Sequence, residues 1–129
     1  MGFGSEPFFT EFSSRGKVLL DASLPQDDGT YRTYRFPWSA TPRTKPLAVA
    51  SRSGPSSVSV YASWNGATRV AEWQFLAGPT AGSLSRVATA RKRSFETRVD
   101  LQSSATVFAV RALDSKGHVI GRSAAVPAS

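Results

Sequence analysis

The amino-acid sequence predicts an all-β chain, a β-sandwich preceded by a short β-meander rich in aromatic residues. Three observations predict this class. Apolar and polar residues alternate in short runs such as 57–64 and 95–101, which places one apolar face on each strand. Clusters of turn-forming residues separate these runs at regular spacing. No segment has the apolar period of a helix.

The lead segment, residues 1–38, is expected to form a meander of at most three strands. These strands are expected at 7–14, 17–22 and 30–36. Ser-Ser-Arg-Gly separates the first two and makes a good hairpin turn, because Gly16 can take a positive φ. Gln26-Asp27-Asp28-Gly29 makes the next turn. A sheet this small covers little apolar surface and is marginally stable alone.

Aromatic residues are concentrated in the lead segment, which holds eight of the fourteen in the chain. They are Phe3, Phe8, Phe9, Phe12, Tyr31, Tyr34, Phe36 and Trp38. This concentration of aromatic residues indicates a surface that packs against another folded surface. Either the lead segment covers the sandwich, or its partner lies outside this chain.

Residues 39–46 have the proline and small polar content of a linker. Residues 47–129 are then expected to form the sandwich. Its strands are expected near 47–52, 57–64, 70–77, 85–90, 95–101, 106–113 and 118–126. Seven strands in about 85 residues is the number typical of an immunoglobulin-like sandwich. The run 106–113 is apolar at nearly every position, as expected of a strand covered on both faces.

Composition limits the chemistry that the chain can perform. The absence of cysteine excludes disulfides, thiolate zinc sites and cysteine nucleophiles. No apolar run approaches the roughly 20 residues of a membrane span, and the first residues do not read as a signal peptide. The net charge of +7 is uneven, because residues 1–38 carry −1 and residues 39–129 carry +8.

Trp64 and Trp73 flank an Asn-Gly pair and could form an aromatic clamp for a ligand. Trp64 shares one face with the apolar residues of 57–64, and Trp73 lies on the apolar face of the following strand. We therefore predict that both tryptophans are core residues. Asn65-Gly66 is then a turn, because both residues tolerate a positive φ.

Two turns contain residues that could act in catalysis or bind a metal ion. His118 could act as a general base oriented by Asp114, although Gly117-His118 reads more simply as a turn that enters the last strand. Asp27-Asp28 could coordinate calcium, although a calcium site needs more oxygen ligands at a set spacing. We assign no catalytic, cofactor-binding or metal-binding residue.

The basic run Arg91, Lys92 and Arg93 could hold phosphate or sulfate groups within the positively charged part of the chain. The simpler alternative is a solvated loop between two strands. No aromatic-bearing recognition motif accompanies the run, so nucleic acid is not favoured as a partner.

Several phrases of the sequence resemble one protein family. "SVSVYASWNGATRVAEWQFLAG", "FETRVDL" and "FAVRALDSKGHVIGRS" resemble the C-terminal, fibronectin-type-III-like region of bacterial arylsulfotransferase-like proteins. "GFGSEPFFTEFSSRGKVLLDASLP" and "YRTYRFPW" resemble the last propeller-blade segment of that family and its exit. The fibronectin III pattern departs at Thr106, where a tyrosine would normally anchor the corner.

The resemblance implies a parent protein with a β-propeller sulfotransferase domain followed by a small sandwich, in an extracellular or cell-envelope location. The family's catalytic histidines belong to the propeller, upstream of the matching region, and His118 does not fall on their motif. The chain is therefore expected to be a non-catalytic C-terminal part that caps or steadies the propeller. The junction is expected to use Tyr31, Tyr34, Arg35, Phe36 and Trp38.

Other functions stay open. A standalone binding module could use the basic face on acidic glycans, sulfated ligands or nucleic acid. Copies of the chain could also form a homodimer by pairing unpaired β-edges. Sulfate transfer by this chain itself would need a nucleophile and a base that the sequence does not pair.

Overall fold

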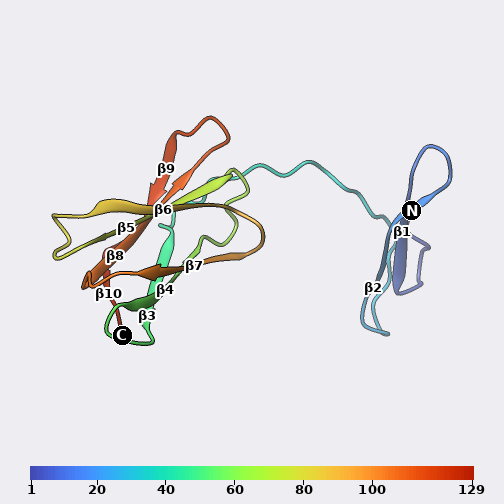
Figure 1. Cartoon of the computed structure of the whole chain (residues 1–129). Helices are drawn as coiled ribbons and strands as arrows, with labels where there is room; N and C mark the ends of the chain where they lie inside the picture. The colour runs from blue at the N-terminus through green and yellow to red at the C-terminus, as the bar shows by residue number, and fades with distance from the viewer. The chain divides into compact units, whose positions relative to one another are not determined.

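The computed structural model describes residues 1–129 and contains strands and turns but no helix (Figure 1). The predicted all-β class is therefore confirmed. The chain divides into two compact units, Met1–Pro37 and Trp38–Ser129. No helix long and apolar enough to cross a membrane is present.

The first unit is built on a two-stranded antiparallel hairpin of β1 (Phe8–Phe12) and β2 (Val18–Ser23). The predicted turn between the strands is confirmed, since Gly16 has a φ of 78°. The backbone N–H of Gly16 donates to the carbonyl of Ser13 at 3.0 Å and closes the turn.

The third strand predicted over 30–36 is wrong. Only Thr30 makes a β-bridge, to Gly4, and the residues after it form no strand. A strand forms only where its backbone hydrogen-bonds to a neighbour, and the residues after Thr30 pair with neither edge of the hairpin. The outer edge of β1 is taken by the first residues of the chain, through a bridge from Gly2 to Phe9.

The second unit holds eight strands in two antiparallel sheets. They are β3 (Leu47–Arg52), β4 (Ser57–Ser63), β5 (Glu72–Gly78), β6 (Ser85–Arg91), β7 (Glu96–Gln102), β8 (Val107–Leu113), β9 (Val119–Arg122) and β10 (Val126–Pro127). One sheet has the order β3-β4-β7. The other has the order β10-β8-β5-β6, and β9 also pairs with β8.

The single strand predicted over 118–126 is divided into β9 and β10. Ser123 causes the interruption, because its buried hydroxyl accepts a hydrogen bond from the N–H of Val110 at 3.0 Å. A side chain thus occupies a position where the carbonyl of a continuous strand would pair with β8.

The hydrophobic core lies between the two sheets, which gives the second unit a sandwich-like form. It is built by alternating residues of β4, β5 and β8, among them Val58, Val60, Ala62, Trp73, Phe75, Phe108 and Val110. Trp64 and Trp73 are both buried in this core, as the alternation predicted. Gly66 has a φ of 77°, so the turn after Trp64 uses the glycine.

Residues 39–46, expected to be a linker, form no strand but are bonded to the second unit. The N–H of Ala40 donates to the hydroxyl of Thr68 at 2.8 Å, and the indole N–H of Trp64 donates to the hydroxyl of Thr44 at 3.1 Å. Pro46 is fully buried. These contacts attach residues 39–46 to the end of the sandwich where Trp64 lies.

Candidate functional site

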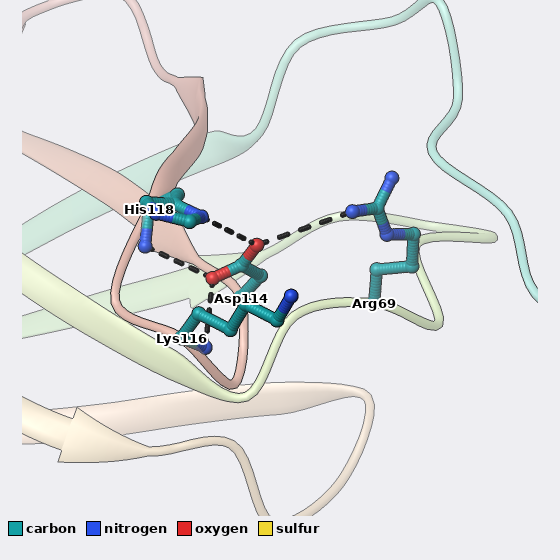
Figure 2. Close-up of polar contacts among 4 residues, drawn as sticks. All are labelled: Arg69, Asp114, Lys116 and His118. Atoms are coloured by element: carbon teal, nitrogen blue, oxygen red, sulfur yellow. Dashed lines mark hydrogen bonds and ion pairs between the residues drawn. The ribbon is translucent and has the colours of Figure 1, made fainter.

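A hollow of about 490 Å³ lies beside the turn that joins β8 to β9. It is lined by Trp38, Ser39, Thr68, Arg69, Val70, Ala71, Asp114, Ser115, Lys116 and His118. Four of its polar side chains, Arg69, Asp114, Lys116 and His118, are drawn in Figure 2. This hollow contains the only histidine of the chain and its neighbouring carboxylate.

Asp114 organises the turn between β8 and β9. Its Oδ1 accepts the backbone N–H groups of Lys116 and His118, each at 2.9 Å (Figure 2). Its Oδ2 lies 3.3 Å from Nδ1 of His118 and 3.9 Å from Nη2 of Arg69. Gly117 has a φ of 82°, which a side chain would disfavour. The turn predicted from the sequence is confirmed.

These hydrogen bonds determine the ionisation of Asp114 and the contacts of His118. The backbone N–H of His118 and, secondarily, that of Lys116 stabilise the carboxylate, so the pKa of Asp114 lies below its usual value. The imidazole of His118 is directed at Asp114, and no serine or threonine hydroxyl hydrogen-bonds to the ring. Nucleophilic catalysis requires a base in contact with its nucleophile. The contacts of the Asp114–His118 pair are those of a turn.

The lowered pKa of Asp114 makes the stability of the second unit sensitive to acid. A carboxyl with a lower pKa in the folded state contributes stability above its unfolded pKa and loses it as the pH falls through the folded pKa. We expect wild-type protein to lose stability below about pH 4 more steeply than Asp114→Asn. Urea unfolding at a series of pH values measures this slope.

The matched control for this experiment is Asp28→Asn, which removes one carboxylate from an exposed turn of the first unit. It should leave the acid slope of the second unit unchanged. Asp100 also has a lowered pKa, chiefly through the hydroxyl of Ser59, and accounts for slope that remains in Asp114→Asn. Equal slopes in wild type and Asp114→Asn would contradict the assigned role.

The structure separates the members of the predicted anion site. Arg91 and Arg93 line a hollow of about 620 Å³ together with Arg98, which the sequence did not single out. Lys92 does not line it, because its ammonium donates to the carbonyl of Ala67 at 3.0 Å. The sequence placed Arg98 on the polar face of the strand expected over 95–101. That pattern does not show that this strand lies next to the one that ends at Arg91.

The predicted junction residues are largely exposed to solvent. Tyr34 and Phe36 stack with ring centroids 6.0 Å apart, and Arg35 forms an ion pair with Glu11. Tyr34 and Arg35 also line a hollow of about 390 Å³ in the first unit. Trp38 clusters with the second unit and lines the hollow beside Asp114.

Asp27-Asp28 lies in the predicted turn, where the N–H of Asp28 donates to the carbonyl of Pro25 at 3.0 Å. The chain contains no group of three or more side chains placed to hold a metal ion. Comparison with known proteins adds no further assignment: no family model, curated protein or solved structure matches the chain.

Proposed function

We propose that the chain is a non-catalytic accessory part of an arylsulfotransferase-like protein. Its first unit would belong to a propeller blade, and its second unit would be a fibronectin-III-like sandwich that steadies the propeller. The sequence resemblance suggests this parent. The observation that carries the proposal is the exposure of apolar side chains on both faces of β2.

Three consecutive apolar residues lie in β2 with large exposed fractions: Val18 at 50%, Leu19 at 56% and Leu20 at 42%. Successive residues of a strand point to opposite faces of the sheet. Both faces of the hairpin are therefore apolar and uncovered within the first unit. Covering the exposed half of each of these side chains would contribute roughly 0.7–1.5 kcal/mol.

A propeller blade supplies the surroundings that such a strand needs. Blades are small antiparallel sheets arranged radially, so that neighbouring blades cover both faces of each sheet. The edge of β2 opposite β1 also has no strand partner. A hairpin with two apolar faces and a free edge is what a separated piece of a blade would present.

The sheet order of the second unit supports the other half of the proposal. The first, second and fifth strands of this unit form one sheet, and the third, fourth, sixth, seventh and eighth strands form the other. Such a division is expected of a fibronectin-III-like sandwich. At the position where the family has a tyrosine, the hydroxyl of Thr106 donates to the carbonyl of Pro79 at 3.0 Å. This bond ties the start of β8 to the loop after β5.

The test uses an arylsulfotransferase-like propeller that has been cut before its own matching segment. We expect the full chain to co-elute with this propeller and to raise its thermal midpoint. Val18→Lys and Leu19→Lys place a charge on opposite faces of β2, and each should abolish the complex. Val49→Lys is the matched control, because Val49 is a similarly exposed strand residue of the second unit.

Complex formation unaffected by Val18→Lys and Leu19→Lys would contradict the proposal, and so would a chain that never binds the propeller. Sedimentation of the chain alone tests the alternative of pairing between copies. A dimer that the same two substitutions dissociate, in a chain that does not bind the propeller, would favour a homodimer instead.

A further inference from the structure

The second unit has a polar hollow between the edge strands of its two sheets. β6 ends one sheet and β7 ends the other, and the two strands lie next to each other. The hollow is lined by Thr89, Ala90, Arg91, Arg93, Ser94, Glu96, Thr97 and Arg98. We propose that this hollow binds an acidic glycan, through a sulfate or carboxylate group held by the arginines.

Two of the three guanidinium groups are available to a ligand. Arg91 and Arg93 are exposed and form no ion pair and no side-chain hydrogen bond within the protein. A guanidinium group donates paired hydrogen bonds that match the geometry of an oxyanion. Without an anion, these two charges stand in the same hollow with no carboxylate bonded to them.

The third guanidinium is held in place by the protein. Arg98 donates to Oδ1 of Asp100 from Nε at 2.9 Å, and its Nη2 lies 2.7 Å from the same oxygen. Its guanidinium also lies 5.6 Å from the ring centroid of Tyr61. Arg98 therefore provides an ordered edge, beside which Arg91 and Arg93 can close on a ligand.

The lining of the hollow also includes a buried, unpaired hydroxyl. Thr97 lines the hollow and is only 8% exposed, yet its Oγ1 has no hydrogen-bond partner in the protein. Leaving a buried polar group unpaired costs about 1–3 kcal/mol, so most such groups have a partner.

The remaining lining favours a sugar over a nucleic acid. Glu96 can accept hydrogen bonds from sugar hydroxyls beside the arginines, and the hollow is lined by no aromatic ring on which a base could stack. Phe95 is exposed but does not line the hollow. Single-stranded nucleic acids are instead bound by several aromatic platforms along a basic groove.

The test is isothermal titration of the full chain with a heparin-derived oligosaccharide. Arg91→Ala combined with Arg93→Ala should weaken binding by about tenfold or more, because two charge-assisted contacts are lost. The control combines Arg86→Ala with Arg122→Ala, which removes the same charge from exposed positions outside the hollow. It should leave the Kd within about twofold. Unchanged thermal midpoints show that both double variants fold.

A comparison of different ligands identifies the chemical group that the hollow binds. The desulfated oligosaccharide separates sulfate from carboxylate recognition, and either one supports the proposal if Arg91→Ala with Arg93→Ala weakens it by about tenfold or more. Equal weakening by the control pair would overturn the proposal, since it would indicate general charge attraction. Tighter binding of a single-stranded oligonucleotide than of the glycan would overturn it too, and so would no binding of either glycan at low salt.

Discussion

Replacing Trp73 with alanine is expected to lower the free energy of unfolding of the second unit by about 3–5 kcal/mol. Trp73 is 0% exposed and lies in β5, between Ala90 of β6 and Ala112 of β8. Its neighbours on the adjacent strands are small, so they cannot fill the space that the indole leaves. The loss combines the transfer free energy of the ring with the cost of the cavity.

Urea unfolding followed by circular dichroism measures this change. Trp38→Ala is the matched control, because it removes the same side chain from a position that is 76% exposed. It should alter stability by no more than about 0.5 kcal/mol. Similar losses in the two variants would show that Trp73 does not pack in the core.

Gly78→Ala is expected to destabilise the second unit by about 1–3 kcal/mol or more. A Cβ at Gly78 would lie 1.8 Å from the carbonyl oxygen of Ser83 and 2.8 Å from its carbon. Both atoms belong to the backbone, so no change of rotamer can relieve the clash. The loop that joins β5 to β6 would have to move, and with it the pairing of Ala77 with Ser85.

Gly82→Ala provides the control within the same loop. Nothing lies within 4 Å of a Cβ built at Gly82. Its effect should stay within about 0.5 kcal/mol, and it can be stabilising because alanine restricts the unfolded chain. Thermal unfolding of the two variants compares them directly, and equal midpoints would contradict the close approach at Gly78.

The two units differ in the surfaces that they expose, and their amino-acid compositions differ in the same way. The first unit exposes apolar side chains on both faces of its hairpin, so its stability and its function both depend on what covers it. The second unit has a closed core and carries most of the positive charge at its surface. A partner for the first unit is therefore expected to be apolar, and a ligand for the second to be anionic.

The sequence by itself determined the strands and their inward faces. Alternation in 57–64 and 95–101 located β4 and β7, and alternation in 57–64 and 70–77 identified Trp64 and Trp73 as core residues. Such patterns are local, because each side chain's face depends only on its position along the strand. The turn glycines, such as Gly16, were visible for the same reason.

Only the tertiary structure decided which strands become neighbours. It left 30–36 unpaired beyond the single bridge of Thr30, divided 118–126 at Ser123, and placed Arg98 in the same hollow as Arg91 while directing Lys92 elsewhere. Each outcome depends on hydrogen bonds or packing between segments far apart in the chain. Local alternation carries no information about such pairings, because any strand edge offers the same backbone donors and acceptors.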